Sequence, residues 1–232
     1  RIDAGAAHAL HQYGMSLLWG DRLDEAVVTF TEHLLHGSYR CQDEWLQIDP
    51  RWSHLDWERR LGAIPGSAAT APGGKQIERF TRINFQFDEA AFLSRHSSAA
   101  PPRPWTIRPM RQSEFDLPGT TVTPRAFWPD AAQFLAYGGG LCAERDGRVG
   151  AMAFTSFRLD ATLEIGIETC APFRGQGLGR AVAIAMIHNC LTRGLEPIWA
   201  CRKENTASFR LAQQLGFFVT KELPYFRLPA PA

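Results

Sequence analysis

The sequence predicts an α/β protein whose main sheet is mixed but mostly antiparallel and is flanked by helices. Three observations in its second half carry this prediction. Three strand-like runs follow one another between residues 141 and 169, and Asp146 with Gly147 forms a strong hairpin-turn signal between the first two. A glycine-rich turn follows the third run and leads directly into a helical pattern over 177–192. Alternating strands and helices then continue to the end of the chain.

The elements of the second half can be justified in order. Pro129 suits the first turn of a helix and Gly138 its end. In the predicted helix over 177–192, apolar residues recur on one face, and Gly194 is expected to end this helix. Asn205 is a good N-cap for a further helix. The predicted strands are 105–108, 141–144, 148–157, 163–169, 197–201, 217–220 and 225–228, and the predicted helices are 129–137, 177–192 and 205–215.

The first half carries mainly helical patterns. Its predicted elements are helices over 6–19, 23–35 and 52–61, an apolar run over 45–48 and a strand over 80–87. The stretch IPGSAATAPGG at 64–74 is expected to be a surface loop, and HSSAAPPRP at 96–104 a linker. We therefore predict two domains: an N-terminal, mainly helical α/β accessory domain over 1–100, and a second domain over 103–232.

Composition and charge narrow the class of function. The formal net charge of +1 gives no support to non-specific nucleic-acid binding. No apolar run approaches the ~20 residues of a membrane span, so no membrane partner is expected. The five cysteines include no C-x-x-C pair, and no secretory signal pattern is visible, which favours a reduced, cytoplasmic protein. The histidines lack zinc-ligand spacing, so we expect no metal site.

The glycine-rich turn RGQGLG spans residues 174–179. Alternate glycines allow a sharp turn and bring backbone N–H groups close to a ligand. The following helix N-terminus is electropositive, and Arg174 and Arg180 add full charges, a combination that suits a phosphate or pyrophosphate. The alternative is a tight strand–helix turn whose glycines serve packing only. The spacing matches neither the dinucleotide-binding fingerprint nor the P-loop.

Two motifs in order carry a family resemblance. Arg174, Gly177 and Gly179 form R-x-x-G-x-G, and WACRKENTASFRLAQQLGF follows about 30 residues later. On these residues the stretch from about 105 to 228 resembles the GNAT superfamily of acetyl-CoA-dependent N-acetyltransferases. More narrowly, it resembles the subgroup that includes zwittermicin-resistance acetyltransferases, in which an extra N-terminal segment also precedes the acetyltransferase half. The first half is itself a candidate degenerate copy of the GNAT-like fold.

The resemblance implies that acetyl-CoA is the co-substrate. The turn would bind its pyrophosphate, the pantetheine arm would pair with the fourth strand of the fold around Glu168 and Thr169, and the thioester would lie where the fourth and fifth strands splay apart. Asn205 would hydrogen-bond the pantetheine arm, although it also serves as a helix cap. The expected coenzyme-binding residues are Ile167, Glu168, Thr169, Arg174, Gly175, Gln176, Gly177, Leu178, Gly179, Arg180, Asn205 and Ser208.

Candidate acid and base residues lie nearby. Glu164 and Glu168 sit on the same face of their strand, with Cα atoms roughly 13 Å apart, so each is a separate candidate base or, alternatively, an ion-pair partner. Ala212 stands where many family members carry the tyrosine that protonates the thiolate. Ser208 is the candidate replacement, with helix packing as its alternative role, and Tyr225 offers another hydroxyl.

These observations predict an enzyme that transfers an acetyl group to a primary amine of a small molecule by direct attack. The alternatives are a protein amine as acceptor and a non-catalytic domain that binds acyl-CoA as a sensor. We expect a monomer or homodimer. Trp52, Trp57 and Trp128 are candidates to line an acceptor pocket, although most aromatic residues are expected in the core.

Overall fold

A computed structural model describes residues 1–231 except 4, 12, 67–74, 97 and 99. The chain forms two compact units. The first unit contains residues 1–84, 201–209 and 220–232, and the second contains residues 85–200 and 210–219. Spatial units need not coincide with functional domains, so the division at 1–100 and 103–232 stays a prediction. Much of the predicted loop at 64–74, and two residues of the predicted linker, lie outside the described residues.

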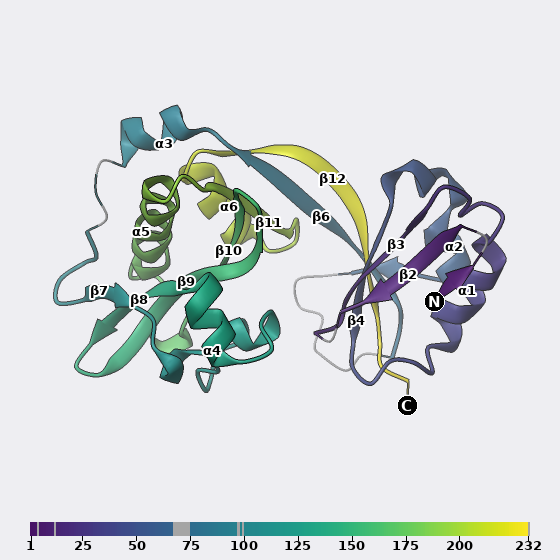
Figure 1. Cartoon of the computed structure of the whole chain (residues 1–232), viewed down its shortest axis with the longest axis horizontal. Helices are drawn as coiled ribbons and strands as arrows, with labels where there is room; N and C mark the ends of the chain where they lie inside the picture. The colour runs from purple at the N-terminus through teal and green to yellow at the C-terminus, as the bar shows by residue number, and fades with distance from the viewer. Residues whose placement is uncertain (4, 12, 67–74, 97, 99, 232) are drawn as a thin grey trace. The chain divides into compact units, whose positions relative to one another are not determined.

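The first unit is a sheet with helices packed on it (Figure 1). Its strands run in the order β1-β2-β3-β4-β12-β6, with β5 beside β6. β3 and β4 pair in parallel, whereas β2 with β3 and β4 with β12 pair antiparallel. The strands are β1 (Ile2–Asp3), β2 (Ala6–Leu10), β3 (Met15–Gly20), β4 (Glu44–Ile48), β5 (Ile64–Pro65), β6 (Glu78–Phe87) and β12 (Phe217–Leu228), of which β6 and β12 continue into the second unit.

The predicted helix over 6–19 is wrong, because these residues form the hairpin of β2 and β3. Gly14 ends the turn with a φ of 84°, and a side chain there would meet the carbonyl oxygen of Asp43. The sequence does not show the alternation of apolar and polar residues that is typical of a strand, because two of the inward-facing positions carry polar residues. These are His8 and Ser16, and both are buried. The first unit is therefore built mainly on strands and is not mainly helical.

The helices of this unit are shorter than predicted. α1 (Val27–His36) begins four residues later than the predicted 23–35 helix. The predicted helix over 52–61 divides into a 3₁₀ helix, η1 (Pro50–Leu55), and α2 (Trp57–Leu61), because Asp56 adopts a left-handed conformation between them. Both α-helices pack on one face of the sheet, and the core residues are Ala6, Leu18, Leu23, Ala26, Val27, Phe30, Leu34, Leu46, Ile48, Trp57, Leu61, Phe226 and Leu228.

A buried carboxylate, Glu44, joins three segments of the first unit. Its Oε1 accepts hydrogen bonds from Ser16 at 2.5 Å and pairs with His8 at 2.7 Å, and its Oε2 accepts from Tyr39 at 2.6 Å. Burial alone would raise the pKa of Glu44, but these hydrogen bonds outweigh it and lower the pKa to about 2. The ring of His33 lies 3.3 Å from that of His8, and burial lowers the pKa of His33 to about 4.

This cluster makes the stability of the fold depend on pH. The unfolded chain binds more protons at His33 between pH 6.5 and about 4, and more at Glu44 between pH 4.5 and about 2. The free energy of unfolding that these two groups contribute is thus fully present above pH 6.5. It is lost in two stages on acidification, first at His33 and then at Glu44. We predict that His33→Gln flattens the first stage, measured by urea unfolding between ~pH 7 and ~pH 4. His36→Gln, on the exposed side of the same helix, should leave the profile unchanged, and an equal effect of both changes would contradict the assignment.

In the second unit the strands run in the order β11-β10-β9-β8-β7. All neighbours pair antiparallel except β10 and β11, which are parallel. In Figure 1, helices α5 and α4 lie on either side of β9. The elements of this unit are α3 (Glu89–Arg95), β7 (Thr106–Pro109), α4 (Ala131–Gln133), β8 (Gly140–Arg145), β9 (Arg148–Leu159), β10 (Thr162–Thr169), α5 (Leu178–Thr192), β11 (Glu196–Arg202) and α6 (Thr206–Gln214), with β11 and α6 continuing into the first unit.

Most of the predicted order of the second half is confirmed, with two differences. The predicted helix over 129–137 is a three-residue α4 followed by a π-helical turn over Phe134–Gly138. The two predicted terminal strands form one continuous strand, β12. In the first half of the sequence, helix α3 was not predicted; Asp88 caps it by accepting a hydrogen bond from the amide of Ala91.

The architecture is the mixed, mostly antiparallel sheet flanked by helices that the sequence predicts. Within the described part of the chain, no helix combines the length and the apolar character needed to cross a membrane. The second unit contains the glycine turn and the strand on which the predicted site depends.

Candidate functional site

The parallel pair of β10 and β11, at one end of the strand order of the second unit, opens partway along its length. β10 and β11 pair only from Thr162 to Glu164 on one strand and from Glu196 to Ile198 on the other. β10 nevertheless continues for five more residues, to Thr169, still paired with β9 on its other side. The predicted splay is therefore present. The edge of β10 beyond Glu164 can pair with an extended ligand through its backbone.

A β-bulge lies at the same place on the other side of β10. The register with β9 shifts between Glu164 and Ile165, which leaves Ser156 as an extra residue on β9. The hydroxyl of Ser156 donates a hydrogen bond of 3.0 Å to the carbonyl oxygen of Glu164. The bulge and the end of the parallel pairing thus meet at one residue of β10. Bulges of this kind bend a strand and are often found next to active sites.

The chain after β10 is anchored before it reaches the helix. The amide of Cys170 donates to the carbonyl oxygen of Gly150 at 2.9 Å, which holds the end of β10 on β9. Phe173 is buried and packs edge-on against Trp105, with ring centroids 4.9 Å apart. These two contacts hold the start of the turn rigidly, while residues 174–177 are exposed.

The three glycines of the turn have different physical roles. Gly175 and Gly177 both have a φ of 77°, which is unfavourable for any residue with a side chain. Gly179 has ordinary helical geometry, but a Cβ atom there would lie 2.7 Å from the hydroxyl oxygen of Thr169. The first two glycines therefore shape the turn, and the third lets α5 approach the end of β10.

The N-terminus of α5 faces this turn. The first intrahelical hydrogen bond runs from the amide of Ala181 to the carbonyl oxygen of Gly177, at 3.1 Å. The amides of Leu178, Gly179 and Arg180 precede it and have no partner within the helix. Over the 15 residues of α5 the peptide dipoles add to a partial positive charge at this end. The turn can therefore bind an anion through its backbone.

Arg174 is turned back toward the strand. Its Nε donates to the carbonyl oxygen of Thr169 at 3.1 Å, and its Nη2 lies 3.5 Å from Oε1 of Glu168. The guanidinium group thus caps the end of β10 while most of the side chain stays exposed. Arg180 is exposed in the first turn of α5. Arg174 and Arg180, the two cations predicted from the sequence to lie beside the turn, are therefore both exposed at its rim.

Glu168 is surrounded by hydrogen-bond donors. Its Oε2 accepts from the amide and hydroxyl of Thr121, at 3.2 and 2.6 Å, and from the amide of Val122 at 3.0 Å. Its Oε1 accepts from the amide of Thr169 at 3.1 Å and faces Arg174. The side chain is buried. Five donors occupy both oxygens, so the carboxylate ties the segment around Thr121 to β10, and little acceptor capacity is left for a substrate proton.

The other predicted acid and base residues have different surroundings. Glu164 is half-buried at the last paired position of β10, where the strands part. Asn205 caps α6 by accepting a hydrogen bond of 3.2 Å from the amide of Ser208. Burial raises the pKa of Cys201, and a hydrogen bond with Ser208 lowers it by a smaller amount. Asn205 and Ser208 belong to the first unit, whereas Ala212 is fully buried in the second.

Nucleophilic cysteine chemistry finds little support at the turn. Burial, and then the charge of Glu168, raise the pKa of Cys170, which disfavours the nucleophilic thiolate. Among the described residues, no three His, Cys, Asp or Glu side chains gather as metal ligands would.

Sequence reasoning did not identify the segment at Thr121 and Val122 as part of the site. These residues lie 47 and 46 positions before Glu168 and carry no motif of their own. The only available signal is the carboxylate itself, because a buried glutamate on a strand needs donors from elsewhere in the fold. Which segment supplies them depends on tertiary structure.

The second unit thus presents an α/β fold whose sheet opens beside a glycine turn and a helix N-terminus. Comparison of the sequence with protein families gives a match to the model described as GNAT acetyltransferase, over residues 70–226. The chain belongs to this family of acetyltransferases. A search of curated proteins returned no match.

Solved structures of other proteins show the same fold. A GCN5-related N-acetyltransferase-like protein from Streptococcus suis superposes with a TM-score of 0.67 at 22% identity, covering 95% of this chain and 82% of its own. A GCN5-related N-acetyltransferase from Kribbella flavida superposes with a TM-score of 0.60 at 14% identity, and the match covers 100% of this chain and 89% of that protein. A GNAT-family acetyltransferase from Colwellia psychrerythraea superposes with a TM-score of 0.52 at 10% identity, and the match covers 97% of this chain and 82% of that protein.

We predict that Glu168→Gln destabilises the protein. The amide would replace one acceptor oxygen with a donor facing the donors that now surround the carboxylate, which should lower the free energy of unfolding by about 1–3 kcal/mol. Urea unfolding near neutral pH measures this. Glu196→Gln, at an exposed position of the same unit, should change it by less than about 0.5 kcal/mol. Equal effects of the two changes would show that the donors around Glu168 contribute nothing to stability.

Proposed function

We propose that this protein transfers an acetyl group from acetyl-CoA to the primary amine of a small molecule. The observation that carries the proposal is the opening of β10 from β11 directly before a glycine turn and a helix N-terminus, all within one unit. An extended thioester with a pyrophosphate has the shape and charge for this arrangement. Family membership supports the acetyltransferase activity.

The residues of the second unit fit this co-substrate. The backbone groups of Ile167 and Thr169 face the open edge of β10, where a pantetheine arm would pair as an added strand, whereas those of Glu168 between them face β9. The backbone amides of residues 175–180 would bind the pyrophosphate, and Arg174 and Arg180, both exposed, would add charge at the rim. For Asn205 and Ser208, which belong to the first unit, a contact with the coenzyme is proposed from the family resemblance alone.

Acetyl transfer by direct attack needs a neutral amine, because an ammonium ion has no lone pair. We assign the proton acceptor to Glu164 rather than Glu168. Glu164 stands where β10 and β11 part, whereas both oxygens of Glu168 already accept hydrogen bonds from the protein. A backbone amide of β10 would stabilise the tetrahedral oxyanion. Ser208 is the proposed proton donor to the leaving thiolate in place of the tyrosine that Ala212 replaces.

Two alternatives remain as proposals of lower rank. A protein amine, either lysine or the N-terminus, has the same nucleophile as a small molecule. The non-catalytic alternative, an acyl-CoA sensor, is favoured by one observation: Ala212 is fully buried, so the position of the missing tyrosine is filled by packing. A closer relationship to the zwittermicin-resistance subgroup, and a cytoplasmic location, also belong to the proposal.

The binding step is tested by isothermal titration with acetyl-CoA and with free coenzyme A. We predict saturable binding of both that Gly177→Trp weakens by at least about 100-fold, or ~2.7 kcal/mol. Gly194→Trp is a matched control, because Gly194 also has a positive φ and an open Cβ position but lies after the other end of α5. A control variant that loses binding equally, or a wild-type protein that binds neither ligand, would contradict the proposal.

The chemical step is tested by thiol release in a screen of small primary amines. We predict turnover that Glu164→Gln reduces by about 100-fold in kcat, a typical contribution of a general base. Glu168→Gln should reduce kcat much less in the protein that remains folded. Turnover by no amine despite coenzyme binding would favour the sensor, and a larger loss from Glu168→Gln would reverse the assignment of the base.

A further inference from the structure

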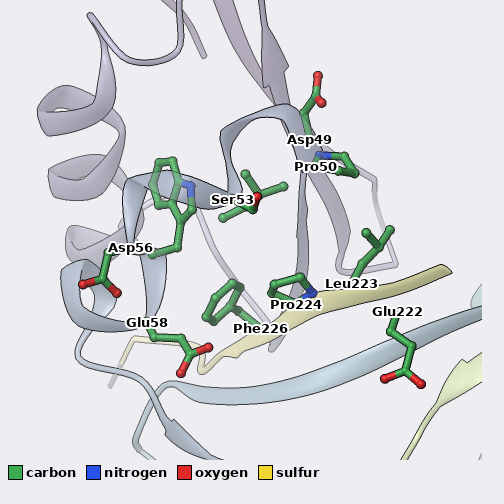
Figure 2. A pocket seen from close by; sticks show the side chains of 11 residues that line it. Asp49, Pro50, Ser53, Asp56, Glu58, Glu222, Leu223, Pro224 and Phe226 are labelled. Carbon is green, nitrogen blue, oxygen red and sulfur yellow. The ribbon is translucent and has the colours of Figure 1, made fainter.

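The first unit has a pocket of its own, formed by three segments (Figure 2). The end of β4 and the 3₁₀ helix η1 contribute one side, the start of α2 a second, and residues 222–226 of β12 a third. All the lining residues belong to the first unit. The cavity has a volume of about 210 Å³. Cavities of about 150 Å³ are large enough to bind benzene, so this one can hold a single ring.

The base of the pocket is apolar. Ile48, Trp57 and Phe226 are buried residues of the core cluster that also line the cavity. Figure 2 shows Pro224 beside Phe226 at this base. The indole N–H of Trp57 donates to the carbonyl oxygen of Trp52 at 3.0 Å, so its polar edge is already satisfied and its remaining surface is apolar. Such a base favours an apolar ring or a short alkyl chain, and the indole ring also attracts cations.

The charged groups of the pocket are all acidic. Among its lining residues, all of them described, four are carboxylates and none is a lysine or an arginine; the carboxylates are Asp49, Asp56, Glu58 and Glu222. Figure 2 shows Asp56 and Glu58 on one side of the cavity and Glu222 on the other. An anionic ligand would be repelled from every side, whereas a cation would be attracted from opposite sides.

Neighbouring cations compensate part of this charge: Asp49 pairs with Arg51 at 2.6 Å, and Arg51 lies outside the lining of the cavity. Glu58 pairs with Arg79 at 3.1 Å and Glu222 with Lys203 at 2.7 Å, and neither cation lines the cavity. Both carboxylates are about half exposed, at 54% and 47%, so the pairs are weak and exchange readily with solvent. A ligand ammonium group can therefore share these carboxylates without displacing a buried ion pair.

We propose that this pocket binds a small organic ammonium ion that carries one apolar ring or a short alkyl chain. The apolar part lies against Trp57 and Phe226, and the ammonium group lies among the carboxylates at the mouth. Both the cavity and its charge are properties of the first unit, so the proposal does not depend on acetyl transfer by the second.

The experiment uses the full chain without any coenzyme and three probes of similar size: benzylammonium, benzyl alcohol and benzoate. Binding is followed through the indole N–H resonance of Trp57, assigned by its loss in Trp57→Phe. We expect saturable shifts with benzylammonium, at least about tenfold weaker binding of benzyl alcohol, and none of benzoate. Raising the salt concentration should weaken binding of the cation.

Two pairs of variants locate the site. Ser53→Trp fills the pocket from an exposed lining position, and Ser38→Trp introduces the same side chain at an exposed position outside it. Glu58→Gln combined with Glu222→Gln removes two mouth charges, and Glu25→Gln removes an exposed charge elsewhere in the same unit. We expect loss of binding with Ser53→Trp, about tenfold weaker binding with the double change, and wild-type binding in both controls.

Three results would overturn the proposal. Benzyl alcohol or benzoate binding as tightly as benzylammonium would exclude recognition of the charge. Undiminished binding in Ser53→Trp would place the site elsewhere. Absence of any Trp57 shift at saturating benzylammonium would show that the pocket takes no ligand of this class. Since no coenzyme is present, each of these results leaves the proposed acetyl transfer untouched.

Discussion

The end of the parallel pairing between β10 and β11 is the constraint on which the second unit depends. A strand inside a sheet normally satisfies its backbone groups on both sides, but among the described residues β10 pairs with a strand on only one side after Glu164. The rest of the site is organised around this edge. The bulge at Ser156 bends the neighbouring strand at the same residue, and the amide of Cys170 ties the end of β10 back to Gly150. An open edge held this rigidly is suited to an extended ligand.

Two buried carboxylates connect distant parts of the chain in a similar way. In the first unit, Glu44 accepts hydrogen bonds from β2, from β3 and from Tyr39 after α1. In the second, Glu168 accepts them from the segment around Thr121 and from its own strand end. Burying a charge without partners would be prohibitive, so each carboxylate specifies which segments must meet. For Glu168 this structural role competes with a role as base, which is why we propose Glu164 as the base.

The sequence predicts the second half well because its signals are local. The hairpin at Asp146 and Gly147, the strand before the turn and the helix after Gly177 each follow from short-range pattern and turn chemistry, and all three are present. The first half was predicted poorly because its signals are not local. The hairpin of β2 and β3 buries His8 and Ser16 against Glu44, which lies about 30 residues away, so its alternation of apolar and polar residues was disguised. The donors around Glu168 and the parting of the strands likewise depend on contacts between distant residues; the second was anticipated only through family resemblance.

The most direct test of the central claim is to record the backbone amide resonances of the turn while coenzyme A or pantetheine is added. Pantetheine lacks the pyrophosphate but retains the arm that would pair with β10. If the turn binds the pyrophosphate, coenzyme A shifts the amides of Gly175, Gly177 and Gly179 and those of Ile167 and Thr169, whereas pantetheine shifts only the strand amides. If coenzyme A leaves the three glycine amides unchanged, or pantetheine moves them equally, the turn is only a tight connection between a strand and a helix.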